Sequence, residues 1–274
     1  MKRSYYFLAI ISILLSACNL PKTGAPPMIT ATPIGPATSI SATMTIVPGP
    51  AVTTNLTCNE LALFLDPALA SGASCETIVE SAEGMEIYPQ YTRLTLQGYM
   101  LSEKFFNPQI AVFPIQRYNE LLPGSVIWNT TKLQALIVGA AADDSLPFLP
   151  TFNAAQIFNA QYKVLPFASG GGIRYLTEYA QYSAPINNTD LVYTYQGLTS
   201  NGLYWVSAIL PINNPILPAD AVNPPGGMSW EEFTNNYQSY ITEMVDQINS
   251  QDSDSYAPTL TALDALVGSI TIQP

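Results

Sequence analysis

Residues 191–210 read LVYTYQGLTSNGLYWVSAIL, two runs rich in Tyr, Val and Leu on either side of Asn201-Gly202. An Asn-Gly pair between alternating apolar residues is a strong hairpin signal, because a type I′ turn needs positive φ at two successive residues. A two-residue loop there would pair Tyr193 with Leu210 and Tyr195 with Ala208. The stretch therefore predicts an antiparallel hairpin with one largely apolar face for the core.

A second hairpin is predicted upstream, from residues 161–168 and 173–182 joined by a turn over Ser169–Gly172. The glycine triplet in that turn is an alternative candidate for an anion-binding nest, but the Lys-Ser/Thr pair of a P-loop does not follow it. Alternating apolar residues predict further strands over 92–101 and 109–115. These elements together indicate a mainly antiparallel sheet.

Three stretches have helical spacing of their apolar residues. They are residues 129–142, the segment that begins with the capping box Ser229–Glu232, and residues 258–267, which are closed by Gly268 and followed by a short strand over 269–273. Hairpins followed by helices predict an α+β domain, with the helices packed on one side of the antiparallel sheet.

The N-terminus has the order of a secretory leader. Lys2-Arg3 precede thirteen uncharged residues from Tyr5 to Ala17, which is shorter than the roughly 20 apolar residues of a spanning helix. Leu15-Ser16-Ala17-Cys18 then fits the lipobox. The N-terminus therefore resembles that of a bacterial lipoprotein. The resemblance implies a signal peptide over 1–17 and diacylglycerol on Cys18, hence membrane lipid as a partner and a domain outside the cytoplasm in the cell envelope.

The stretch after Cys18 has a different composition from the rest of the chain. No charged residue occurs between Lys22 and Glu60, and Pro, Thr, Ala and Ser dominate. Such a segment has few large side chains to bury and is interrupted by prolines, so a disordered tether is predicted over 18–57. At about 3 Å per residue it could reach roughly 100 Å. A single globular domain is predicted over 58–274.

Two other short resemblances lie in the body of the chain. Residues 263–272, LDALVGSITI, resemble the end of PsbP-like α+β domains, which implies a fold and no chemistry. The body also resembles uncharacterised bacterial lipoproteins, through residues 146–150 (LPFLP), 195–199 (YQGLT) and 179–186.

Cys58 and Cys75 are the cysteines that remain once Cys18 is lipidated. An even pair in an exported domain predicts a disulfide. The alternative, a reactive thiol, needs a nearby cation, and the chain has no histidine and only 9 Lys and Arg residues.

Composition excludes several classes of function. The absence of histidine removes His-based triads, His metal ligands and His proton shuttles. Removal of residues 1–17 leaves 7 basic and 20 acidic residues, a net charge of −13. Because nucleic-acid affinity comes from neutralising phosphates with Lys and Arg, nucleic acid is not an expected partner.

Other sequence patterns that could indicate a catalytic or metal site are weak. Asp143-Asp144 would need a partner carboxylate to act in glycoside hydrolysis. Asp252-Ser253-Asp254 begins like a calcium loop but has Ala257 where an EF-hand has glycine, and Ser102-Glu103-Lys104 lacks the commoner Ser-x-x-Lys spacing. Neither a metal site nor a cofactor is predicted.

Aromatic residues are the more suggestive feature. Tyr and Trp are enriched at interfaces, since each combines an apolar ring with a polar group. Tyr182, Tyr204 and Trp205 are the side chains predicted to form an exposed binding surface.

Three functions are compatible with these features. The first is a non-enzymatic, lipid-anchored surface protein that binds an envelope protein or glycan. The second is a carboxylate-dependent glycan hydrolase, favoured by the many acids and aromatics. The third is the solute-binding lipoprotein of a transporter, which usually needs two βαβ lobes that the hairpin pattern does not predict.

Overall fold

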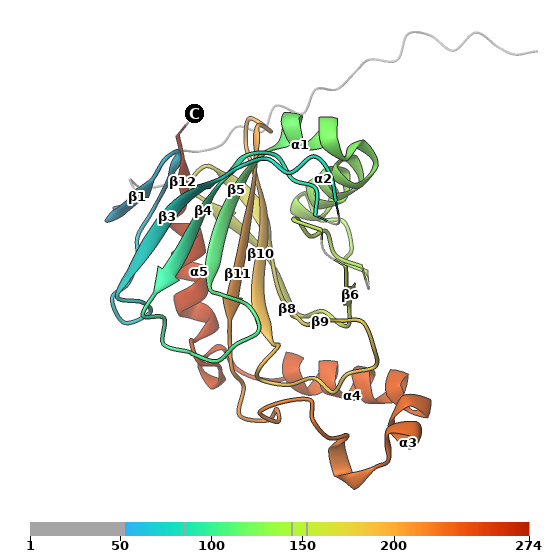
Figure 1. Cartoon of the computed structure of the whole chain (residues 1–274). Helices are drawn as coiled ribbons and strands as arrows, with labels where there is room; N and C mark the ends of the chain where they lie inside the picture. The colour runs from blue at the N-terminus through green and yellow to red at the C-terminus, as the bar shows by residue number, and fades with distance from the viewer. Residues whose placement is uncertain (1–52, 85, 144, 152, 274) are drawn as a thin grey trace, which may run out of the picture. The chain divides into compact units, whose positions relative to one another are not determined.

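The computed structural model describes residues 53–84, 86–143, 145–151 and 153–273, which form an α+β domain built around an antiparallel sheet (Figure 1). The sheet has seven strands, in the spatial order β3 (Gly72–Ile78), β4 (Tyr91–Gln97), β5 (Gln109–Pro114), β11 (Tyr204–Pro211), β10 (Val192–Thr199), β8 (Gly170–Thr177) and β7 (Ala160–Phe167). Every adjacent pair in it is antiparallel. The predicted α+β class is confirmed.

Two smaller sheets and five α-helices complete the described part of the chain. The small sheets are β1 (Leu56–Cys58), β2 (Leu61–Leu63) and β12 (Thr271–Ile272), and β6 (Ala155–Gln156) with β9 (Tyr179–Ala180). The helices are α1 (Ile115–Leu121), α2 (Pro123–Ile137), α3 (Trp230–Asn235), α4 (Tyr237–Asn249) and α5 (Leu260–Gly268), with 3₁₀ turns η1 (Pro225–Gly227) and η2 (Ser253–Ser255).

The predicted hairpin over 191–210 forms β10 and β11 at the centre of the sheet. Its predicted register is confirmed, with Tyr193 opposite Leu210 and Tyr195 opposite Ala208. The turn differs from the type I′ prediction. The Gly202 N–H donates to the Thr199 carbonyl over 2.8 Å, and φ is positive at Gly202, +70°, but not at Asn201. Residues 200–203 therefore form the loop.

The second predicted hairpin is also present, as β7 and β8, but its glycines are not the turn. Phe167 pairs with Gly170, so Ala168 and Ser169 make the turn and the glycines belong to β8. A Cβ on Gly170 or Gly172 would collide with a carbonyl oxygen of β10. The glycine triplet thus permits the close approach of β8 to its neighbour.

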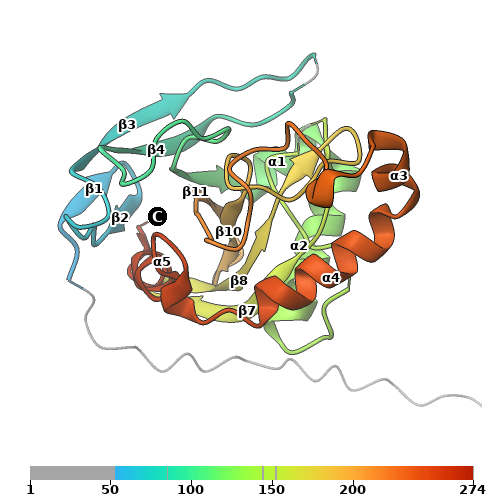
Figure 2. The same ribbon diagram turned by 90° about the horizontal axis from the view of Figure 1, so that it is seen from below.

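The helices cover both faces of the sheet, which corrects the prediction that they pack on one side. Alternate residues of β10 belong to different cores: Tyr193 and Tyr195 lie in one with α4 and α5, and Leu198 lies in the other with α1 and α2. Figure 2 shows α5 and α2 on opposite sides of β10 and β8. As a result, all eight residues of β10 are buried.

Helix boundaries follow the predicted caps where a cap exists. Ser229 Oγ accepts the Glu232 N–H, as the capping box predicts, and Thr259 Oγ1 accepts the Ala262 N–H at the start of α5. The helix after Ser229 is interrupted at Asn236, which separates α3 from α4. Helix α2 begins at Pro123 and ends at Ile137, several residues before the predicted range at both ends.

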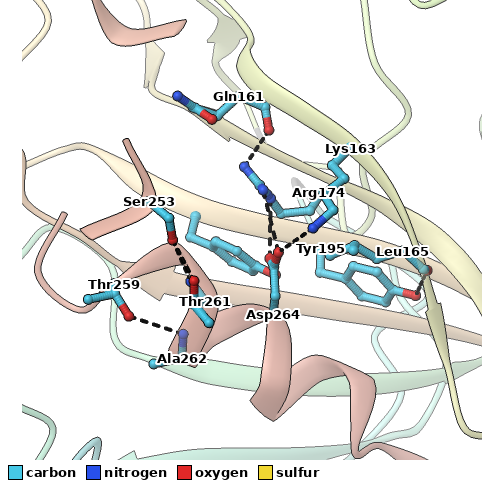
Figure 3. A network of polar contacts seen from close by, with 11 residues as sticks. Gln161, Lys163, Leu165, Arg174, Tyr195, Ser253, Thr259, Thr261, Ala262 and Asp264 are labelled. Atoms are coloured by element: carbon cyan, nitrogen blue, oxygen red, sulfur yellow. Dashed lines mark hydrogen bonds and ion pairs between the residues drawn. The ribbon is translucent and has the colours of Figure 1, made fainter. Parts of the chain in front are cut away.

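A partly buried ionic network fixes α5 to the large sheet (Figure 3). Asp264 of α5 lies 3.2 Å from Nε of Arg174 on β8 and 3.2 Å from Nζ of Lys163 on β7, and it accepts a 3.0 Å hydrogen bond from the Tyr193 hydroxyl. Arg174 also donates to the Gln161 carbonyl over 2.5 Å. One carboxylate of α5 therefore contacts three strands.

The three-stranded sheet joins the two ends of the described chain. β2 pairs with β1 on one side and with β12 on the other. β1 begins at Leu56, two residues before the predicted domain boundary. The predicted Cys58–Cys75 disulfide is present, with the two Cα atoms 5.5 Å apart, and it connects β1 to the edge strand β3.

Candidate functional site

Two adjoining cavities, of about 870 and 500 Å³, lie beside the small β6–β9 sheet. They share residues of β9 and of the loops that flank β6 and β9, and we call them together the aromatic groove. β9 follows β8 after a single residue, and β6 is held to it by pairing of Ala155 with Ala180. The shared wall consists of Asn153, Ala154, Ala180, Gln181 and Tyr182.

Two exposed aromatic side chains line the smaller cavity. Tyr182 is 63% exposed and Phe105 is 69% exposed. Phe105 comes from the connection between β4 and β5, and its N–H donates to the Thr189 carbonyl over 3.1 Å. This bond brings two loops that are distant in sequence to the same side of the groove. Rings held in the open in this way are suited to contact with a ligand.

Two carboxyl groups also line the smaller cavity, on Glu178 and Asp190. Glu178 is only 1% exposed, and its Oε1 accepts the Asn187 N–H over 2.6 Å. The Asn187 side chain donates to Asp190 Oδ2 over 2.8 Å, so Asn187 bridges the two acids. Burial raises the pKa of Glu178 well above its ordinary value, and the neighbouring Asp190 raises it further.

The loop over 184–190 is held by two tyrosines of α4. The Tyr237 hydroxyl donates to the Ala184 carbonyl over 3.1 Å, and the Tyr240 hydroxyl accepts the Ile186 N–H over 2.9 Å. Burial, together with the charge of Glu178, raises the pKa of both hydroxyls to about 12. These side chains therefore stay neutral at physiological pH and fix one wall of the groove.

Asp190 acts electrostatically on Lys104, but Lys104 forms no ion pair with either acid. Its ammonium group donates to the Asn188 carbonyl and to Asn213 Oδ1. Burial lowers its pKa, and Asp190 partly offsets that effect. Among the described residues, no ion pair involves Glu178 or Asp190, and the lining of the aromatic groove contains neither Lys nor Arg.

Of the three aromatic residues predicted to form a binding surface, only Tyr182 lies at the groove. Tyr204 is half-buried at the β10–β11 turn and packs against the core on the α5 side. The prediction for Trp205 is wrong: it is 0% exposed, and its Nε1 donates to Gln196 Oε1 over 2.8 Å within the second core. Helices on both faces of the sheet account for this difference.

The weaker candidates do not assemble into a site. Asp143 is an exposed partner of Lys132, with 2.6 Å between Oδ1 and Nζ, while Asp144 lies outside the described residues. Asp252 precedes the 3₁₀ turn η2, and Ser253 Oγ accepts a hydrogen bond from the Thr261 N–H. Across the described ranges, no group of three or more metal-ligating side chains occurs. The predicted lipidation site, Cys18, also lies outside the described residues.

The sequence interpretation missed Phe105, Glu178 and Asp190. Glu178 had a usable signal, because it is the single acid in the predicted strand over 173–182. Phe105 and Asp190 had none, since their proximity depends on which loops meet in the fold.

Comparison of the chain with protein-family models, curated proteins and solved structures finds no match. Within the described part of the chain, no helix has both the length and the apolar character needed to cross a bilayer.

Proposed function

We propose that this chain is a lipid-anchored protein of the bacterial cell envelope whose globular domain binds an envelope glycan in the aromatic groove. The observation that carries the proposal is the groove itself. It presents Tyr182 and Phe105 in the open beside the side-chain amides of Asn153 and Gln181. Aromatic faces pack against the apolar faces of sugar rings, while amides both donate and accept hydrogen bonds, as sugar hydroxyls do.

Lipid anchoring is supported by the lipobox at Leu15–Cys18 and by the Cys58–Cys75 disulfide, which suits an oxidising compartment outside the cytoplasm. We expect Cys18→Ser to abolish incorporation of labelled fatty acid and to leave the leader uncleaved at this site. The measurement is labelling followed by determination of the N-terminus, with Cys75→Ser as the matched control. Continued labelling of Cys18→Ser would contradict anchoring at this residue.

Binding in the groove is tested with Tyr182→Ala. Loss of an exposed aromatic contact that anchors a ligand is expected to weaken binding to purified cell-wall glycan by about tenfold or more. Co-sedimentation of the full chain with insoluble glycan gives the measurement, and Trp128→Ala removes an exposed ring on α2, outside the groove, as the control. Equal losses of binding in the two variants would contradict binding at the groove. If the chain bound an envelope protein but not the glycan, the ligand would be a protein instead.

A second candidate, a carboxylate-dependent glycan hydrolase, is favoured by one observation. Glu178 and Asp190 both line the smaller cavity, and the raised pKa of Glu178 is the property of a general acid. Both carboxyl groups accept hydrogen bonds from Asn187 and thereby hold the loop over 184–190. This structural role favours binding over hydrolysis. Release of reducing ends from wall glycan that is lost in Glu178→Gln, while binding persists, would establish hydrolysis instead.

A further inference from the structure

The two acids of the aromatic groove lack a cationic partner within the described part of the chain. Buried carboxyl groups in proteins are normally paired or neutralised, because desolvation of an isolated charge is costly. Glu178 is 1% exposed and belongs to no ion pair, and the nearby Lys104 is used by Asn188 and Asn213. The smaller cavity thus has space and two carboxyl groups, and the residues that line it include no cation. Burial favours the neutral form of Glu178, and an ammonium group bound beside it would favour the ionised form.

The aromatic side chains add to the preference for a cation. Phe105, Tyr179 and Tyr182 line the same cavity as the two acids. The face of an aromatic ring attracts an ammonium group through its quadrupole, and this attraction increases where water is partly excluded. An anionic ligand would instead meet two carboxyl groups without any basic residue in the lining. The volume, about 500 Å³, is within the range of small-ligand sites.

Given the proposed glycan-binding function, on which this step rests, we propose that the aromatic groove binds an amino sugar with a free ammonium group. The ammonium group lies between Glu178 and Asp190, and the sugar ring packs against Tyr182 and Phe105. The unacetylated amine is the recognised feature, because acetylation would remove the charge that the two acids require. The side-chain amides of Asn153 and Gln181 contact the hydroxyl groups.

The test compares two oligosaccharides of equal length, a β-1,4-linked glucosamine hexamer and its fully N-acetylated form, in a pH series from mildly acidic to neutral. The series covers both the charged form of the amines and the ionisation of Glu178, whose pKa is raised. The affinities are measured by calorimetry with the full chain in detergent. An ionic strength of about 0.15 M screens long-range electrostatic attraction. We expect the glucosamine hexamer to bind at least about tenfold more tightly. Glu178→Gln should remove most of that difference, because glutamine keeps an oxygen acceptor for the Asn187 N–H but cannot carry negative charge.

Glu83→Gln is the matched control, since it removes one acid from the exposed loop between β3 and β4. Equal weakening by Glu83→Gln and Glu178→Gln would overturn the proposal in favour of attraction to net charge. Equal binding of the two hexamers would overturn the ammonium preference and leave glycan binding intact. If the chain bound oligolysine but neither hexamer, the proposal that the ligand is a sugar would be overturned as well. Near-ultraviolet circular dichroism of each variant establishes that the fold is retained.

Discussion

Replacement of Asp264 by alanine is expected to lower the free energy of unfolding by about 3–5 kcal/mol. The carboxylate of Asp264 is the ionic partner of Arg174, whose side chain is only 6% exposed on β8. Without it, the guanidinium group remains buried with an uncompensated charge, and the Tyr193 hydroxyl loses its acceptor. Urea unfolding of the full chain gives the measurement.

Two further variants make the Asp264 prediction specific. Asp246→Ala removes an exposed acid from α4 and should change the unfolding free energy by less than about 0.5 kcal/mol. Arg174→Met combined with Asp264→Ala should recover part of the loss, because the unpaired charge is removed together with its partner. A loss in the double variant as large as in Asp264→Ala would mean that packing of α5, and not the buried charge, determines the effect.

Removal of the Cys58–Cys75 disulfide is expected to lower the free energy of unfolding by about 3 kcal/mol. The sequence separation of 17 residues defines the loop that the bond closes in the unfolded chain, and closing it reduces the entropy of that chain. The measurement is urea unfolding of the variant with both Cys58→Ser and Cys75→Ser. Cys58 is 2% exposed, so Cys58→Ala with Cys75→Ala separates the cost of a buried hydroxyl from the loss of the bond.

Reductant provides the control for the disulfide prediction. It should destabilise the natural chain by nearly the same amount as the double substitution and should leave both double variants unchanged. An equal response of natural chain and variants to reductant would show that the cross-link has no part in the stability of the domain.

The hairpin of β10 and β11 could be predicted in register because its information is local. Alternation along residues 191–210 and the position of Asn201-Gly202 determine which residues face each other. The covering of its second face could not be predicted in this way. Gln196 lies on the face opposite the predicted core face, yet its side chain donates to Thr194 and Ser207 over 2.9 Å and accepts from Trp205. A satisfied amide is thus compatible with a buried layer.

The role of the glycines of β8 could not be predicted from the sequence either. Gly170–Gly172 have the composition of a turn, and the sequence offers no sign that the backbone of β10 passes close to them. Of the candidate site, only Tyr182 was predicted, and among the missed residues only Glu178 had a signal in the sequence. The other components of the site come from the β4–β5 connection, the β6–β9 sheet and the loop over 184–190, which meet only in the folded chain. Strands of two residues, such as β6 and β9, are also too short to show periodicity.

The pairing of β12 with β2 has a consequence for the order of folding. Leu61 and Ala62 lie opposite Ile272 and Thr271, and the Phe64 N–H donates to Ser269 Oγ across a separation of 205 residues. Closure of so long a segment is slow, because its entropy cost precedes the contacts that compensate for it. During synthesis from the N-terminus, β2 can therefore pair with β1 early but gains its second neighbour only after residues 271–272 have been made. Deletion of Thr271 and Ile272 would leave β2 with an open edge.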